Sequence, residues 1–173
     1  MADGDGVDVL NAMNAMLPAS EMPAHPSSPT LQSEHMAAMD LAPPQNATHV
    51  AAASGDWSSP STWQAGRIPD EGSRVLIPEG VVLTLDSELT SSLKWLRVNG
   101  ELRFAIDRDT ELRVDTLVTA PGSRLEIGTA EQPVPSNVRA QIVFADLGPL
   151  NVDDDPMLMG RGAILHGSTR IHG

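Results

Sequence analysis

The sequence predicts an all-β fold of the β-solenoid type, preceded by a disordered N-terminal leader. From residue 57 onward apolar and polar residues alternate, and this period of two is typical of half-buried strands. Glycines precede these alternating segments at intervals of about 20 residues, as expected for the turns of stacked coils. The 14 glycines and 14 prolines among 173 residues favour short elements separated by turns. We expect one domain of ordinary size with a tail.

Residues 1–53 form the predicted leader, which is acidic and rich in proline and methionine. They hold six of the 14 prolines and six of the eight methionines, and residues 1–56 contain seven acidic residues but neither Lys nor Arg. A segment with so few aromatic and β-branched residues buries too little apolar surface to fold, so we expect it to be mostly disordered. The spacing of Leu10, Met13 and Leu17 allows one short helix, which Pro18 would end.

Residues 54–173 form the predicted domain, and its strands are marked by apolar residues two positions apart. Two such residues point to the same face of a strand and indicate a half-buried element. The groups are Val75 and Ile77; Val81, Leu83 and Leu85; Leu96 and Val98; Leu102 and Phe104; Leu112 and Val114; Leu125 and Ile127; Ile142 and Phe144.

A repeat of glycines favours a solenoid over other all-β folds. Gly80, Gly100 and Gly122 each precede an alternating segment, with separations of 20 and 22 residues, and a similar unit returns at Gly167. A β-sandwich built of hairpins has similar turn spacing and stays the alternative. Outward charged residues support the solenoid, because stacked coils would align them as ladders of opposite charge. The expected ladder pairs are Glu101/Arg103, Glu111/Arg113 and Arg124/Glu126.

The composition excludes several classes of site and partner. The chain has no Cys, so it holds neither a disulfide nor a Cys-based metal or nucleophile site. Its formal net charge is −12, of which residues 57–173, with 16 acidic and 11 basic residues, contribute −5. This balance argues against a nucleic-acid partner. No apolar run reaches the roughly 18 residues of a membrane span, and no secretory signal peptide is visible at the N-terminus.

The ordered Trp, Gly and Pro positions of residues 55–173 resemble those of the eight-glycine domain. The segments that carry the resemblance are Gly55–Trp63, Gly66–Pro69, Gly72–Gly80, Leu96–Phe104, Gly122–Gly128 and Gly160–Gly167. The resemblance implies a β-rich module of extracellular or cell-surface proteins, including relatives of cell-surface hyaluronidases and of fibrocystin, and of bacterial secreted proteins. It also implies that a right-handed parallel β-helix follows the domain. This downstream β-helix is therefore an expected partner of the chain.

Two tryptophans are the candidate binding residues. Trp57 and Trp63 could stack on the faces of sugar rings, because an indole supplies an apolar plane and an N–H donor. The alternative is that both close the open end of the solenoid core. A polysaccharide or glycoconjugate is therefore a possible partner.

Carboxylates and histidines supply the candidate metal and acid–base residues. Asp153, Asp154 and Asp155 precede Pro156, and oxygen ligands of this kind suit calcium, whereas the alternative is a solvated acidic turn. His166 and His172 flank Gly167 and would suit a metal or acid–base role only if both face outward.

We interpret the chain as an extracellular carbohydrate-associated binding or structural module that caps a downstream β-helix, with no catalytic residue of its own. One alternative is a non-catalytic part of a hyaluronidase-like enzyme that degrades polysaccharides. Another is a cell-surface module that binds proteins.

Overall fold

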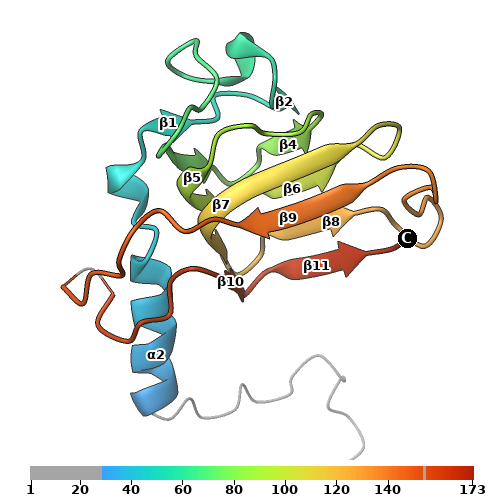
Figure 1. The fold of residues 1–173 in the computed structure, drawn as a ribbon. Coiled ribbons are helices and arrows are strands. Elements are labelled where there is room, and N and C mark those ends of the chain that lie inside the picture. The colour runs from blue at the N-terminus through green and yellow to red at the C-terminus, as the bar shows by residue number, and fades with distance from the viewer. Residues whose placement is uncertain (1–28, 154) are drawn as a thin grey trace, which may run out of the picture. The chain divides into compact units, whose positions relative to one another are not determined.

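The computed structural model describes residues 29–153 and 155–173, and strands dominate the secondary structure of these residues (Figure 1). The chain divides into two compact units, Met1–Ser33 and Glu34–Gly173, and only residues 29–33 of the first are described. The helix allowed by the sequence between Leu10 and Leu17 lies outside the described residues. The described part contains helix α2 (Pro29–Asp40) and two 3-10 turns, η1 (Pro44–Asn46) and η2 (Pro60–Thr62).

The strands form two parallel sheets that the chain visits in alternation. The six-stranded sheet has the order β1 (His49–Val50), β3 (Arg74–Ile77), β5 (Leu93–Val98), β7 (Thr110–Thr119) and β10 (Ala163–Leu165), with β9 (Ala140–Phe144) also paired to β7. The five-stranded sheet has the order β2 (Gly55–Asp56), β4 (Val82–Leu85), β6 (Glu101–Phe104), β8 (Arg124–Ile127) and β11 (Ser168–Ile171). All nine pairings between these strands are parallel, so the alternative of a sandwich of hairpins is wrong for the described residues.

The register confirms the predicted spacing near 20 residues. Val75 pairs with Leu96 and Leu96 with Leu117, so successive partners in the six-stranded sheet are 21 residues apart. In the five-stranded sheet Leu83 pairs with Leu102 and Leu102 with Leu125, at separations of 19 and 23 residues. Since parallel in-register strands place like positions over one another, apolar residues stack in rows from strand to strand.

These rows form the main core between the two sheets. It comprises 17 buried residues, and many of its aliphatic side chains have no solvent-exposed surface. All seven apolar groups expected from the sequence fall in or beside the strands β3 to β9, and most of their members are buried. The members of the main core are Ala51, Trp57, Trp63, Val75, Ile77, Leu83, Leu85, Leu93, Leu96, Val98, Leu102, Phe104, Leu112, Val114, Leu117, Leu125 and Ile127.

A second, smaller apolar cluster lies on the other face of the six-stranded sheet. Met39 at the end of α2 and Ala42 just after it pack with Trp95 of β5 and Val118 of β7. The guanidinium of Arg97 donates hydrogen bonds to the carbonyl oxygens of Met39 and Ala42, at 2.9 and 3.1 Å. A cation at the end of a helix satisfies carbonyl groups that have no partner within the helix.

The predicted leader therefore contains ordered elements in its last part. Helix α2 and turn η1 lie within residues 29–53, and His49 and Val50 form β1, the first strand of the six-stranded sheet. Ala51 is 1% exposed and belongs to the main core. The division of the chain at residue 53 stays a prediction, but the first strand begins before it. Period-two patterning could not reveal β1, because the strand has two residues only.

Two of the three expected charge pairs, Glu101/Arg103 and Arg124/Glu126, form a ladder on the outer face of the five-stranded sheet, whereas Glu111 and Arg113 on β7 lie in register with the uncharged Gln141 and Val143. Register places Glu101 beside Arg124 and Arg103 beside Glu126. Arg103 Nε lies 2.7 Å from Glu101 Oε1 along the strand and 3.9 Å from Glu126 Oε1 on the next strand. Arg124 Nη1 lies 3.6 Å from the same Glu101 oxygen. These pairs are partly exposed, so each contributes about 0 to 1 kcal/mol, and their main effect is to favour this register.

Gly100 sits where two turns approach each other too closely for any side chain. A Cβ atom on Gly100 would lie 2.3 Å from the carbonyl oxygen of Pro78 and 2.4 Å from that of Val81. Both atoms belong to the backbone, so neither can rotate away. Gly80 and Gly122, the neighbouring glycines of the repeat, have φ angles of 78° and 83°, which favour glycine for a different reason.

Replacing Gly100 by alanine should destabilise the chain by about 3 kcal/mol, because the turn at Pro78–Val81 would have to move. We expect the melting temperature to fall by roughly 10 °C for a chain of this size. Gly162→Ala is the matched control, since a Cβ there meets no atom within 4 Å. Equal melting temperatures for the two variants in a calorimetric scan would contradict this account.

Candidate functional site

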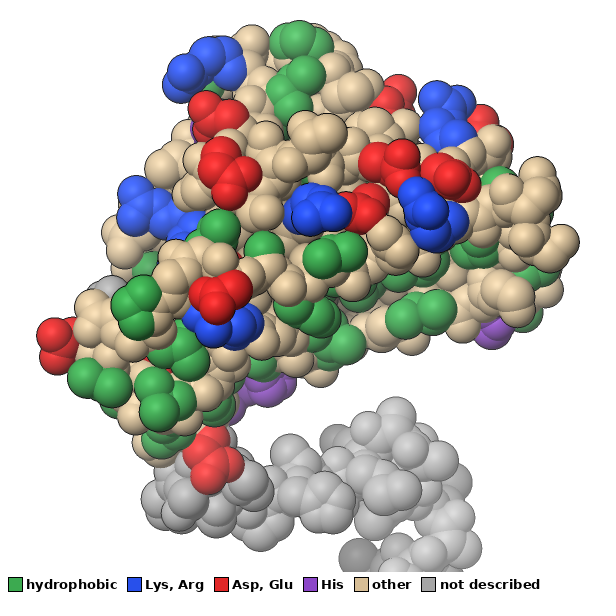
Figure 2. All heavy atoms as spheres, in the orientation of Figure 1, with side chains coloured by type: hydrophobic (Ala, Val, Ile, Leu, Met, Phe, Trp, Pro, Cys, Tyr) green, Lys and Arg blue, Asp and Glu red, His purple; other side chains and the backbone are tan. Residues whose placement is uncertain are grey.

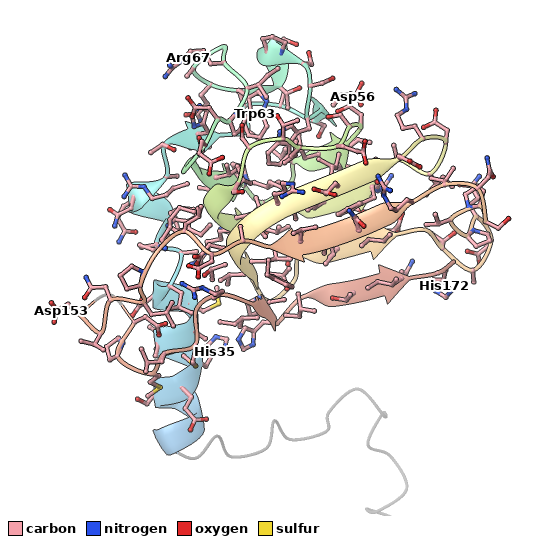
Figure 3. All side chains as sticks on the ribbon, viewed as in Figure 1. His35, Asp56, Trp63, Arg67, Asp153 and His172 are labelled. Atoms are coloured by element: carbon pink, nitrogen blue, oxygen red, sulfur yellow. The ribbon has the colours of Figure 1, made fainter. Side chains whose placement is uncertain are left out.

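Trp57 and Trp63 lie in the main core and not on the surface. They are 1% and 2% exposed, and their rings meet edge to face with centroids 5.0 Å apart. Trp63 Nε1 donates a hydrogen bond to the carbonyl oxygen of Trp57 at 2.9 Å, whereas Trp57 Nε1 has no hydrogen-bond partner. In Figure 3 the labelled Trp63 lies among the elements around β1 and β2. Neither indole plane is open to a sugar in this arrangement, so sugar binding by the two residues stays a prediction without an exposed surface to support it.

The candidate calcium residues are placed in the segment between β9 and β10. Asp155 is 6% exposed, and its carboxylate oxygens accept hydrogen bonds from the amides of Met159 and Gly160 at 2.9 and 2.8 Å. Asp153 is exposed and Asp154 lies outside the described residues. Across residues 29–153 and 155–173, no group of three or more His, Asp or Glu side chains is arranged to hold a metal. Asp155 therefore shapes its own loop, and calcium binding stays a prediction.

His166 and His172 have different neighbours. The ring of His166 lies edge to face with that of His35 on α2, with centroids 4.4 Å apart. Burial lowers the pKa of His166 below its usual value, and the nearby His35 lowers it further when charged. His172 instead lines a hollow next to Val134. Figure 3 shows His35 and His172 at different places on the molecule.

The charged residue with the least exposed surface in the described part of the chain is Asp115, which no motif in the sequence marks. Asp115 lies on β7 and is 1% exposed. Its carboxylate lies 3.5 Å from Lys94 Nζ and 3.9 Å from Arg161 Nε, and it accepts a hydrogen bond from Thr116 Oγ1 at 2.9 Å. The sequence does contain a signal for this site, which is a charged residue inside the apolar run of a strand. Because charged residues are seldom buried without a partner, such a residue indicates a nearby residue of opposite charge.

Asp115 lines a hollow of about 210 Å³ between the six-stranded sheet and the segment after β9. Trp95, Asn151 and Asp155 line the same hollow. Two carboxylates thus share one small cavity, but those of Asp155 are held by backbone amides and that of Asp115 by two cations. The arrangement suits a fixed polar anchor, because every charged oxygen already has a donor or cation beside it.

Arg161 connects this anchor to the segment between β9 and β10. Besides Asp115, its guanidinium contacts Asp146 at 2.8 Å and the carbonyl oxygen of Gly148. The backbone amide of Arg161 donates to Thr116 Oγ1 at 3.0 Å. One arginine therefore joins both ends of the segment to β7, and the charge of Asp115 holds it there.

Replacing Asp115 by asparagine should lower stability by about 2–3 kcal/mol, because Lys94 and Arg161 would lose the carboxylate that neutralises them. Asp107→Asn is the control: the carboxylate of Asp107 pairs with Arg108 at 2.8 Å, but the two side chains are 65% and 57% exposed. In a urea titration, the midpoint of unfolding should move to a lower urea concentration for Asp115→Asn and should stay unchanged for Asp107→Asn. If the two midpoints coincide, Asp115 does not anchor the segment.

Burial of His166, together with its contact with His35, should make stability depend on pH. Because folding lowers the pKa of His166, the stability associated with it is present above the usual pKa of histidine and is lost as pH falls through the folded value. His49, whose pKa is also lowered by burial, adds a term of the same sign. Between pH 7.5 and 5.5 the melting temperature should fall, and less so in His166→Gln than in His172→Gln. An unchanged pH slope in His166→Gln would show that neither the burial of His166 nor its contact with His35 contributes to the pH dependence.

No helix within the described residues combines the length and the hydropathy needed to cross a bilayer. No solved structure matches the chain.

Comparison with known proteins identifies relatives over part of the chain. Mouse (Mus musculus) fibrocystin is 34% identical over 87 residues, which cover 50% of this chain and 2% of that protein. Human (Homo sapiens) fibrocystin-L is 35% identical over 77 residues, and dog (Canis lupus familiaris) fibrocystin is 33% identical over 78, each covering 44% of this chain. This chain spans about 2% of the length of these relatives. The family model of the G8 domain, the eight-glycine domain, matches residues 62–173, well over half of the chain. The chain belongs to the G8 domain family.

Proposed function

We propose that this G8 domain is an extracellular or cell-surface module that closes one end of a longer parallel β-helix. The observation that carries the proposal is the difference between the two ends of the core. One end is closed by buried tryptophans, whereas the other presents strands whose outer edges have no partner strand among the described residues and whose apolar side chains are exposed. A module that ends a stack of strands needs one closed and one open end.

The closed end is the one formed by β1 and β2. Both strands have only two residues, so little backbone is left unpaired at these edges. Trp57 and Trp63 lie in the core beside them, and an isolated antiparallel bridge joins Ala51 to Trp63. The bridge turns the chain across the end of the core, which makes addition of another parallel strand there unfavourable.

The open end is the one formed by β10 and β11. In the part of the chain that the structure describes, no strand pairs with the outer edge of either. All four residues of β11 are exposed. Leu165 and Ile171 are 46% and 63% exposed, although Ile171 is paired in register with the buried Ile127. The next row of the apolar stack is therefore begun and left uncovered.

We further propose that the alternating sheets are coils of a β-solenoid of the right-handed parallel β-helix type. Parallel pairing at near-constant separation and a shared apolar interior support this class. A following β-helix would then continue both sheets by pairing with β10 and β11. The small share that this chain represents of its fibrocystin relatives supports a role within larger proteins.

Carbohydrate association, which the family resemblance implies, would require an exposed aromatic plane. All three tryptophans are at most 4% exposed. The proposal therefore depends on the open end and not on a sugar site.

The open end should make the full chain self-associate when no β-helix covers it. Replacing Leu165 and Ile171 together by lysine should yield a monomer, because charged side chains on an edge oppose strand pairing and apolar contact. Sedimentation velocity over a range of concentrations measures this. Ile68→Lys is the matched control, since Ile68 is 41% exposed but lies outside β10 and β11.

Two results would count against the proposal. The first is a wild-type chain that stays monomeric at every concentration. The second is an equal loss of self-association in Ile68→Lys, which would assign the contact to another surface.

A further inference from the structure

We propose that the segment between β9 and β10, here called the β9–β10 loop and described at residues 145–153 and 155–162, presents a preformed docking surface for a protein whose apolar depression is rimmed by Lys and Arg. This surface is separate from the open end formed by β10 and β11. Its features are an inserted position, exposed apolar side chains, a constrained backbone and a negative charge.

The β9–β10 loop is an insertion that strand pairing does not require. Residues 140–144 of β9 pair with residues 110–114 of β7, and residues 163–165 of β10 pair with residues 117–119 of the same strand. Only Asp115 and Thr116 separate the two paired parts of β7, whereas the whole β9–β10 loop separates their partners. Loops longer than about 15 residues without secondary structure of their own are usually either functional or disordered linkers. The contacts of Asp155 and Arg161 hold the described part of this loop in place, which favours the functional class.

The β9–β10 loop carries three large apolar side chains in exposed positions, here called the apolar patch. Val152, Met157 and Leu158 are 60%, 45% and 56% exposed. Figure 2 shows apolar side chains gathered with acidic ones in the region where Figure 1 draws this loop. Asp153, labelled in Figure 3, lies at the tip of the loop. Exposed apolar clusters rimmed by polar residues are typical of protein-binding surfaces.

The backbone holds the apolar patch outward at the cost of strain. Leu158 and Arg161 have φ angles of 51° and 58°, and they are the two residues other than glycine with positive φ in the described part of the chain. For a branched side chain such as leucine this conformation is unfavourable. The Asp155 carboxylate and the contacts of Arg161 with Asp115 fix the conformation. A strained conformation fixed by buried charges, with its apolar residues outside the core, is typical of a functional surface.

The charge of the β9–β10 loop decides the kind of partner. Residues 145–162 contain four Asp and one Arg, a formal charge of −3. Asp153 is exposed, and so is Asp146, whose side chain is 69% exposed beside Arg161. Asp146 pairs with Arg161 at 2.8 Å and Asp155 is 6% exposed, so among the described residues of the loop the solvent-facing carboxylate with no cation beside it is that of Asp153. A carboxylate in this position repels phosphates, which argues against nucleic acid and anionic lipid. Apolar residues flanked by carboxylates instead complement a protein surface with an apolar centre and a basic rim.

The test begins with selection of a random peptide library displayed on phage against the full 173-residue chain. The expected peptides combine apolar residues with Lys or Arg, and one consensus peptide is then synthesised and titrated calorimetrically. Leu158→Gly should weaken its binding at least tenfold and leave the melting temperature unchanged or higher, because glycine adopts positive φ without strain. Asp153→Lys should also weaken binding, and added salt should weaken binding to the wild-type chain.

The control variant is Ile68→Gly, which removes a side chain of 41% exposure from a different surface and should leave peptide binding unchanged. Three results would overturn the proposal. They are selection of no common peptide, consensus peptides whose binding is insensitive to Leu158→Gly, and binding of the chain to phosphatidylserine vesicles that Leu158→Gly abolishes. The last result would assign the apolar patch to a membrane surface.

Discussion

The rest of this structure depends on the in-register parallel pairing that stacks apolar residues between the two sheets. Leu83, Leu102 and Leu125 lie in one row, and Val75, Leu96 and Leu117 lie in another, and all six are at most 1% exposed. A shift of one residue in any strand would turn its buried residues outward, so the apolar rows determine the register. The turns must then bring the chain back after a nearly constant number of residues. Gly100 illustrates this constraint, because the carbonyl oxygens of Pro78 and Val81 occupy the space that a side chain at this position would need.

A stack of this kind has two ends, and in this chain the apolar residues at the two ends differ in their exposure to solvent. At the β1–β2 end, tryptophans and a crossing segment cover the apolar rows. At the β10–β11 end of the described residues, Ile171 continues the row of the buried Ile127 and is 63% exposed. Burial of apolar surface favours covering this end by another row, which is the physical basis of the proposed capping role.

The apolar rows determine the register of the strands, whereas the buried charge of Asp115 holds the β9–β10 loop against the sheet. It lies at the point of β7 that faces neither β9 nor β10, where the β9–β10 loop leaves the sheet. Lys94 and Arg161 neutralise it, and Arg161 in turn holds the loop. Because a buried carboxylate is costly without its cations, the loop and the sheet are coupled energetically. The rigidity of the apolar patch depends on this coupling.

The sequence by itself determined the all-β class, the positions of the strands from β3 to β9, the repeat length and the charge ladder on the five-stranded sheet. These features follow from local periodicity, since residues two positions apart share a face and turn glycines mark the repeat. The sequence also showed the family resemblance, through the order of its Trp, Gly and Pro positions. The two-residue strand β1 was missed because a pattern cannot be read from so short a segment.

Only the tertiary structure decided which residues meet across the chain. It buried Trp57 against Trp63, brought His35 to His166 and placed Lys94 and Arg161 beside Asp115. A tryptophan near a turn has the same local pattern whether it closes a core or faces a ligand, and a carboxylate in a strand does not indicate its cation. These outcomes depend on how segments far apart in sequence pack together, because burial and charge pairing are set by three-dimensional neighbours and not by sequence spacing.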